Sequence, residues 1–111
     1  MKMIVAVIKP EQLPAVKDAL FEAEIRHMTA TSVRGTATRT EQQQFRGVKK
    51  EVSLVDRIRV ELAVNDATME KAVEAITRGA KESGGSGKIF VSDLHDVITV
   101  WTGERGSRAL Y

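Results

Sequence analysis

The sequence has 111 residues, 42% of them hydrophobic and 29% charged, with a formal net charge of +2 and no cysteine. This length accommodates one domain with one core, and the missing cysteines exclude disulfides, thiolate catalysis and cysteine-ligated zinc, as is usual in the reducing cytoplasm. The small net charge does not indicate a general nucleic-acid binder. No apolar run approaches the ~20 residues of a membrane span and the chain starts without a cleavable signal pattern, so we expect a cytoplasmic protein that does not insert into membranes.

The first third of the chain predicts a strand, a helix and a second strand. The continuous apolar run from Met3 to Ile8 is typical of a central strand that is covered on both faces. Proline is tolerated only in a first helical turn, so Pro14 predicts a helix that begins near Leu13. The apolar positions of this helix recur at helical spacing: Leu13, Val16, Leu20 and Ala23. The second strand is expected at about residues 28 to 34, which are rich in Thr, Ala and Val.

Residues 36 to 53 are polar and follow neither a helical nor a strand period. A loop of this length in a compact domain is usually functional or disordered. Phe45-Arg46-Gly47 combines an aromatic ring, a forked cation and a glycine, a composition typical of residues that bind a partner protein. We therefore predict a protruding arm that contacts a partner; a solvated loop without a role is the alternative.

The second half of the chain predicts the same order of elements again. Residues 57 to 64 alternate most clearly, with Ile58, Val60, Leu62 and Val64 on one face and Arg57, Arg59 and Glu61 on the other. Asn65 or Asp66 is expected to cap a helix that ends near Glu82. Its apolar stripe is Met69, Ala72, Val73, Ile76 and Ala80. A further strand is expected at 89 to 91, and a strand pattern resumes at 97 to 102.

This order, β-α-β, arm, β-α-β, predicts an α+β, ferredoxin-like βαββαβ fold with both helices on one face of a four-stranded sheet. The whole chain, 1–111, forms one domain with the arm at about 36–53 and a tail at about 103–111. The other sheet face and Trp101 favour contact with another subunit. RNA-recognition domains share the order of elements, but the predicted third strand lacks the aromatic residues that stack on bases, so we do not expect nucleic-acid binding.

The most specific stretch is Gly84-Gly85-Ser86-Gly87-Lys88, which is followed directly by a strand pattern. Glycines allow successive N–H groups to point toward one anion, and the lysine adds a mobile cation. The stretch is not a Walker A loop, because Glu82 and Ile89 stand where glycine and Ser or Thr are required. We predict an anion cradle; a flexible linker is the alternative.

No arrangement in the sequence requires an enzyme. His27 and His95 have no ligand spacing around them that indicates a metal site, and His95 is expected to be a solvated turn residue. Glu61 is the one carboxylate that we can name as a base for nucleotide hydrolysis. A slow ATPase is therefore kept only as an alternative.

Several segments resemble one family over nearly the whole chain. They include Ile8-Lys9-Pro10, Phe45-Arg46-Gly47 and Thr102-Gly103-Glu104. The run Gly85-Ser86-Gly87-Lys88-Ile89-Phe90-Val91 is the most specific, since the family carries Gly-Asp-Gly-Lys-Ile-Phe-Val. The chain is identified by this resemblance as a divergent member of the PII signal-transduction (nitrogen regulatory protein P-II) superfamily.

The resemblance implies a non-enzymatic homotrimer that binds ATP, ADP or AMP in the clefts between subunits and acts in nitrogen metabolism. The backbone and lysine of the cradle would hold phosphates, residues around Gly35 and the strand of Glu61 and Ala63 would line the nucleotide, and residues 27–29 would approach from the adjacent subunit. The implied nucleotide-binding residues are Val7, His27, Met28, Thr29, Gly35, Thr36, Ala37, Thr38, Glu61, Leu62, Ala63, Gly85, Ser86, Gly87, Lys88, Thr99 and Trp101.

The arm corresponds to the family's T-loop, which changes shape with the bound nucleotide and inserts into a target such as a membrane transporter or a metabolic enzyme. The residues implied in partner binding are Arg39, Phe45, Arg46, Gly47, Lys49 and Lys50. Lys50 occupies the position of the tyrosine that is uridylylated in many relatives, so this modification is not expected there.

The chain departs from the family at its ligand contacts. Thr38-Arg39 replaces the Arg-Gln pair that helps to bind magnesium and 2-oxoglutarate, which leaves Mg²⁺ open and argues against 2-oxoglutarate. Thr99 and Trp101 replace two arginines that reach the neighbour's phosphates, each worth about 1.5–3 kcal/mol as a charge-assisted bond. Arg105 or Arg108 would have to compensate. The alternative function is a PII-like sensor of AMP or ADP and a small anion such as bicarbonate in carbon metabolism.

Overall fold

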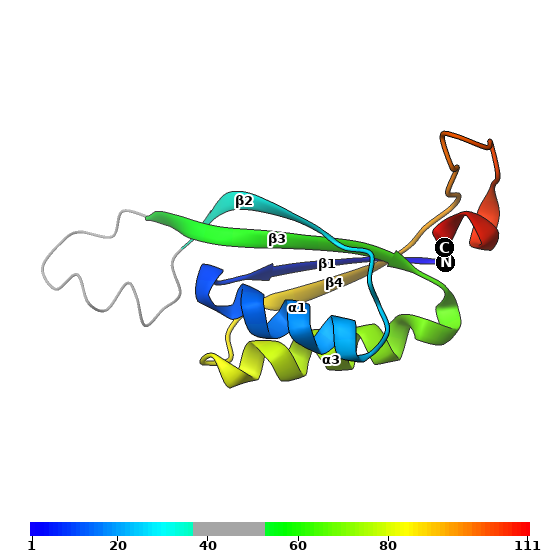
Figure 1. The fold of residues 1–111 in the computed structure, drawn as a ribbon. Coiled ribbons are helices and arrows are strands. Elements are labelled where there is room, and N and C mark those ends of the chain that lie inside the picture. The colour runs from blue at the N-terminus through cyan, green and yellow to red at the C-terminus, as the bar shows by residue number, and fades with distance from the viewer. Residues whose placement is uncertain (37–52) are drawn as a thin grey trace, which may run out of the picture.

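The computed structural model describes residues 1–36 and 53–111 (Figure 1). Its strands and helices are β1 (Lys2–Ile8), α1 (Leu13–Glu22), β2 (Thr29–Thr36), β3 (Leu54–Val64), α3 (Met69–Glu82) and β4 (Lys88–Asp93). Short 3₁₀ turns occur at η1 (Pro10–Gln12), η2 (Asp66–Thr68) and η3 (Gly106–Leu110). No helix in the described ranges is long and apolar enough to span a membrane.

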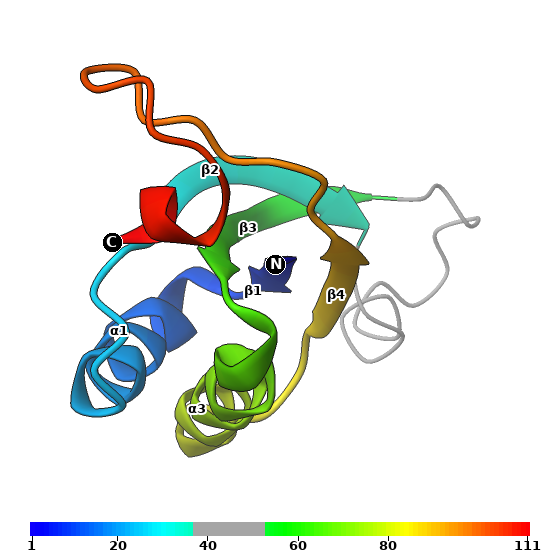
Figure 2. The ribbon, with the colours of Figure 1, turned by 90° about the vertical axis from the view of Figure 1, so that its right-hand side faces the viewer.

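The four strands form one antiparallel sheet in the order β2-β3-β1-β4, and α1 and α3 lie side by side on one face of it (Figures 1 and 2). β1 is central: Ala6 pairs with Val60 of β3 on one side and with Ile89 of β4 on the other. The predicted α+β fold, βαββαβ, is therefore confirmed.

The core lies between the sheet and the two helices. Alternate residues of the central strands point into it, as the strand period requires, and the helices contribute residues at helical spacing. The fully or nearly fully buried apolar residues include Ile4, Ala6, Ile8, Val16, Leu20, Val60, Leu62, Val64, Ala72, Ala75 and Ile76. A Cβ on Gly79 would lie 2.6 Å from the Val16 Cα, so a glycine in α3 allows the two helix backbones to approach closely.

The four predicted strands of the sheet, including the one at 89–91, and both helices are confirmed, with shifts of one to three residues at most ends. α1 begins at Leu13 and α3 ends at Glu82, as expected. β1 is central, but within the described chain the helices cover only one of its faces. Val5 and Val7 on the other face are half-buried.

The strand predicted at 97–102 is wrong. The chain leaves the sheet after β4 and forms a hairpin, in which Ile98 and Arg105 make an isolated bridge and the Gly103 N–H donates to the Thr99 oxygen at 2.8 Å. This segment projects away from the sheet (Figures 1 and 2). Val100 and Trp101 at its tip are 99% and 94% exposed. The apolar alternation indicated strand propensity correctly, but within residues 1–36 and 53–111 no strand lies beside this segment to complete a ladder.

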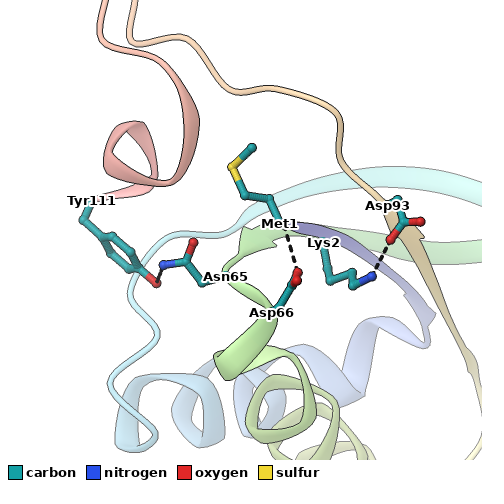
Figure 3. Close-up of polar contacts among 6 residues, drawn as sticks. All are labelled: Met1, Lys2, Asn65, Asp66, Asp93 and Tyr111. Carbon is teal, nitrogen blue, oxygen red and sulfur yellow. Dashed lines mark hydrogen bonds and ion pairs between the residues drawn. The ribbon is translucent and has the colours of Figure 1, made fainter.

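The second helix was predicted to be capped by the side chain of Asn65 or Asp66, and neither side chain makes such a capping hydrogen bond. Asn65 precedes η2 but makes no side-chain cap; its Nδ2 donates to the Tyr111 hydroxyl at 3.1 Å (Figure 3). The Asp66 carboxylate instead accepts from the Met1 amine at 2.9 Å, which lowers the pKa of Asp66. Lys2 and Asp93 form a third contact beside these, and their hydrogen bond lowers the pKa of Asp93.

Candidate functional site

The glycine stretch begins as the C-terminal cap of α3. The Gly85 N–H donates to the Ala80 oxygen at 3.0 Å and the Gly84 N–H to the Lys81 oxygen at 3.4 Å, which is the Schellman pattern. This cap requires a positive φ after the helix, and Gly84 and Gly85 have φ of 103° and 62°. The cap turns the chain from the end of α3 toward the start of β4.

Gly87 then brings the backbone against β1. A Cβ at this position would lie 2.8 Å from the Val7 oxygen, and its φ is 135°, so both space and conformation require glycine. Lys88 follows as the first residue of β4 and pairs with Val7. The sequence 84–88, which we call the glycine turn, is thus held against the end of the central strand.

The glycine turn has the features of an anion nest. Within the described ranges, the N–H groups of Ser86 and Gly87 donate no hydrogen bond, and Lys88 is exposed and forms no ion pair. Unbonded N–H groups beside a cation attract an anion that can accept from them. The predicted anion cradle therefore has two backbone N–H groups and one ammonium group that could donate hydrogen bonds to an anion.

The glycine turn lines an open hollow of about 410 Å³, which we call the basic hollow. Its walls are the end of β1, the end of β2, β3 and the start of β4. They consist of Val7, Ile8, Lys9, Gly35, Thr36, Arg57, Ser86, Gly87, Lys88 and Phe90. Three of these residues are basic and none is acidic, so the field in the hollow favours an anion.

Arg57 is the least exposed of the three cations, at 9%. Its Nη1 donates to the Asp56 backbone oxygen at 2.9 Å, and its stem lies 3.3 Å from the position of a Cβ on Gly35. Gly35 therefore leaves room for the arginine stem at the wall of the hollow. The guanidinium is thus planar, charged and held at the wall of the hollow, where it adds to the positive field.

A second hollow of about 390 Å³, which we call the His27 hollow, lies elsewhere on the same chain. It is lined by Met3, Arg26, His27, Met28, Thr29, Glu61, Leu62 and Ala63. Pairing of Thr29 with Glu61 between β2 and β3 brings its two halves together. The Glu61 carboxylate forms an ion pair with Arg59 at 2.8 Å.

Most of the described candidates for nucleotide binding line one of the two hollows, whereas Gly85 lines neither and lies beside a smaller hollow with Lys81 and Ile89. Gly35 was expected beside Glu61 and Ala63, with residues 27–29 coming from another subunit. The structure instead gathers 27–29 and 61–63 in the His27 hollow and places Gly35 in the basic hollow. Thr29 and Gly35 stand near opposite ends of β2, about 20 Å apart at ~3.3 Å per residue, so the two hollows are separate in one chain.

Thr99 and Trp101 line neither hollow; they lie on the hairpin that follows β4. Arg105 is bound to Asp96 there, through Nη2 at 2.6 Å and Nε at 2.9 Å to Oδ2. Arg105 is thus engaged within its own chain, whereas Arg108 is exposed. Ala37 and Thr38 lie outside the described residues, as do the predicted partner-binding residues Arg39, Phe45, Arg46, Gly47, Lys49 and Lys50.

Sequence reasoning missed four residues of the basic hollow: Ile8, Lys9, Arg57 and Phe90. The signal for Lys9 is its place directly after the central strand, at the same end as the turn before β4. Among the described residues, no three or more carboxylate and histidine side chains gather to hold a metal ion. His95 is exposed and stands in an irregular segment.

Comparisons with known proteins identify the family of the chain. The profile of the family described as nitrogen regulatory protein P-II matches residues 1–104. Nitrogen regulatory protein GlnK1 of Methanosarcina mazei is 41% identical over 114 residues, covering 99% of this chain and 97% of that protein. Nitrogen regulatory protein P-II 2 of Methanothermobacter thermautotrophicus is 38% identical over 112 residues, with the same coverage of 99% and 97%.

Among solved structures, Arabidopsis thaliana PII bound to citrate superposes with a TM-score of 0.77 at 32% identity, covering 97% of this chain and 90% of that one. The chain is thus similar to P-II proteins in both sequence and fold over almost its full length. The chain belongs to the P-II family of nitrogen regulatory proteins, which are non-enzymatic signal transducers.

Proposed function

We propose that this chain senses an adenine nucleotide, ATP, ADP or AMP, and controls a target protein through residues 36–53, in the regulation of nitrogen metabolism in the cytoplasm. Membership of the P-II family supports a regulatory role, and the family binds adenine nucleotides as effectors. The assignment of a nucleotide site to particular residues of this chain is argued from the basic hollow.

The observation that carries the proposal is that the glycine turn, which includes Lys88, lines one hollow together with two further cations, Lys9 and Arg57. Phosphate oxygens would accept from the Ser86 and Gly87 N–H groups and from Lys88, and Lys9 and Arg57 line the same hollow. Charge-assisted bonds of this kind are shorter and about twice as strong as neutral ones. A di- or triphosphate supplies the charge that such a hollow favours.

The rest of the nucleotide would lie against a second copy of the chain. The basic hollow and the His27 hollow share no residue, so a neighbour whose His27 hollow faces the basic hollow would complete one site. The sheet face left uncovered by the helices supports such contact, because it carries Val5, Val7 and Phe90, the last 54% exposed. P-II proteins are typically trimers, and we propose a homotrimer here.

The target of the regulator would be a membrane transporter or a metabolic enzyme that binds the loop at 36–53. The sequence contains one tyrosine, Tyr111, and none in this loop. We therefore propose that the loop acts without uridylylation. Co-purification of a target by the full chain, and its loss when Phe45 and Arg46 are both replaced by alanine, would support the loop's role.

A second candidate is a sensor that takes a small carboxylate or bicarbonate beside AMP or ADP. Arg57 favours it, because a planar guanidinium matches a carboxylate in two parallel bonds. The related Arabidopsis protein was solved with citrate, a small polycarboxylate. Mg²⁺ would accompany ATP, and Thr38-Arg39 in place of the family's Arg-Gln pair still argues against 2-oxoglutarate.

Calorimetric titration of the full chain with ATP, ADP, AMP, adenosine, 2-oxoglutarate and bicarbonate tests the proposal. We expect the phosphorylated nucleotides to bind more tightly than adenosine, and Lys88→Ala to weaken ATP binding by about 1.5–3 kcal/mol, the value of a bond to a charged group. Lys71→Ala removes the same charge from the exposed face of α3 and serves as the control. Equal binding of ATP by the two variants, or no nucleotide binding at all, would reject it.

A further inference from the structure

Gln12 is fully buried, although it is polar; it is the last residue of η1 and directly precedes α1. All of its hydrogen-bonding partners are backbone groups. Its Oε1 accepts from the Lys9 N–H at 2.7 Å, and its Nε2 donates to the Ala80 oxygen at 3.1 Å and to the Ser86 oxygen at 3.0 Å. Both amide hydrogens are therefore used.

These three bonds join segments that are far apart in the sequence. Ala80 lies in the last turn of α3, 68 residues from Gln12, and Ser86 lies in the glycine turn, 74 residues away. Lys9 directly follows β1 and lines the basic hollow. One side chain thus ties two walls of the hollow together from the buried side.

The bond to Ser86 also sets the direction of a peptide group. The described chain contains no cis peptide bond, and in a trans peptide the carbonyl and the N–H point in opposite directions. Because the Ser86 oxygen points to the buried Gln12, the Gly87 N–H of the same peptide points away from it. We infer that Gln12 locks the Ser86–Gly87 peptide in the orientation that presents an N–H to an anion, and is a positioning residue for the phosphate site; this inference rests on the proposed nucleotide function.

A lock is needed because this peptide is easily reversed. Its rotation changes the φ of Gly87, and glycine adopts positive and negative φ almost equally well. Gly85, with φ of 62°, gives the preceding chain the same freedom. A reversed peptide would place the Ser86 oxygen, rather than an N–H, where the phosphate binds, and would repel it. Gln12 holds the carbonyl inward by donating to it.

The experiment compares the full chain with Gln12→Met, which keeps the length of the side chain and removes the amide. Gln12→Asn, whose amide is one methylene too short to reach both carbonyls, is the milder second variant. Leu20→Ala is the control, because it truncates another fully buried side chain at the far end of α1. ¹⁵N relaxation of the ligand-free proteins gives the order parameter of the Gly87 N–H, and calorimetry gives the affinities for ATP and adenosine.

We expect the Gly87 order parameter to fall from the rigid value of about 0.85 to below about 0.6 in Gln12→Met, and to stay unchanged in Leu20→Ala. ATP affinity should fall about tenfold, the equivalent of one ordinary hydrogen bond, while adenosine affinity stays the same. An unchanged order parameter, or an equal loss for ATP and adenosine, would overturn the inference. If the wild-type chain binds no nucleotide, the proposed function fails, and the order parameter alone decides the role of Gln12.

Discussion

The Val7 oxygen lies 2.8 Å from the position that a Cβ on Gly87 would occupy. This contact fixes the glycine turn against the end of β1. The basic hollow is therefore lined by two segments, around Val7 and Gly87, that are 80 residues apart in the sequence. Both the packing and the φ of 135° at Gly87 exclude a side chain there.

Gly87→Ala should therefore lower both stability and anion affinity. A positive φ costs an L-residue about 1–2 kcal/mol, and the contact with the Val7 oxygen adds to this, so we expect a loss of about 3 kcal/mol in urea unfolding. Gly103→Ala is the matched control, because Gly103 has φ of 73° but nothing within 4 Å of a new Cβ. Gly87→Ala should lose more, because of its contact with the Val7 oxygen and because a φ of 135° is less accessible to an L-residue than a φ of 73°. Equal losses in the two variants would contradict this.

Arg57→Gln should weaken binding of anionic ligands and leave adenosine binding unchanged. Arg57 is one of three cations in the basic hollow, and removing a charged donor costs about 1.5–3 kcal/mol. Arg78→Gln is the control, since Arg78 lies on α3, outside the basic hollow, and forms a weak surface ion pair with Glu74 at 3.7 Å. Calorimetry with ATP and citrate would check this, and similar affinities in both variants would remove Arg57 from the site.

The hairpin that carries Trp101 should loosen in acid. The hydrogen bond from Arg105 lowers the pKa of Asp96 below its usual range, and the Val97 N–H also donates to this carboxylate. An unfolded aspartate titrates near about 3.9, so the stabilisation is complete above that pH and is lost as the pH falls through the lower pKa of the folded chain. Trp101 is the one tryptophan of the sequence, so its fluorescence anisotropy should drop at that pH.

Asp96→Asn should produce the same drop at neutral pH. Asp66→Asn is the control, because the pKa of Asp66 is also lowered but the residue lies at the start of η2, away from the hairpin. An anisotropy that falls equally in both variants, or does not fall in Asp96→Asn, would contradict a brace formed by Asp96 and Arg105.

Gly79→Ala tests the packing of the two helices. Alanine is a better helix former than glycine by about 1 kcal/mol, which alone would stabilise α3. The new Cβ would lie 2.6 Å from the Val16 Cα and 2.7 Å from the Ala15 oxygen, and backbone atoms cannot move aside as a side chain does. Overpacking of this kind costs about 1–3 kcal/mol, so we expect net destabilisation in thermal unfolding; a raised midpoint would contradict the close helix contact.

The sequence predicted well those features that depend on neighbours along the chain. The apolar run of β1, the alternation of Val60, Leu62 and Val64, and the end of α3 at Glu82 all follow from local periods and caps. The glycine turn was singled out because its glycines permit positive φ and are followed by Lys88 and a strand pattern, and the positive φ of Gly84, Gly85 and Gly87 agrees with this. The hairpin at 97–105 was mistaken for a strand of the sheet because its strand propensity is real, but among the described residues it pairs only with itself, through Ile98 and Arg105.

Features that depend on distant contacts gave no local signal. The division of the predicted nucleotide residues into two hollows follows from the register of β2 against β3, which pairs Thr29 with Glu61 and Gly35 with Val55. Gln12 stands among polar residues near two prolines, and its burial results from contacts 68 and 74 residues away. Arg57 and Arg59 were predicted on the same face of β3. Arg57 lines the basic hollow together with the glycine turn and Arg59 does not, and the spacing in the sequence does not indicate this difference.

The most direct measurement is a crystal structure of the chain with ATP. The account predicts a trimer in which phosphate oxygens accept from the Gly87 N–H and from Lys88 Nζ of one chain, while His27 and Glu61 of a neighbouring chain lie beside the same nucleotide. A structure in which the phosphates bind away from the glycine turn, or in which one chain alone encloses the nucleotide, would contradict it.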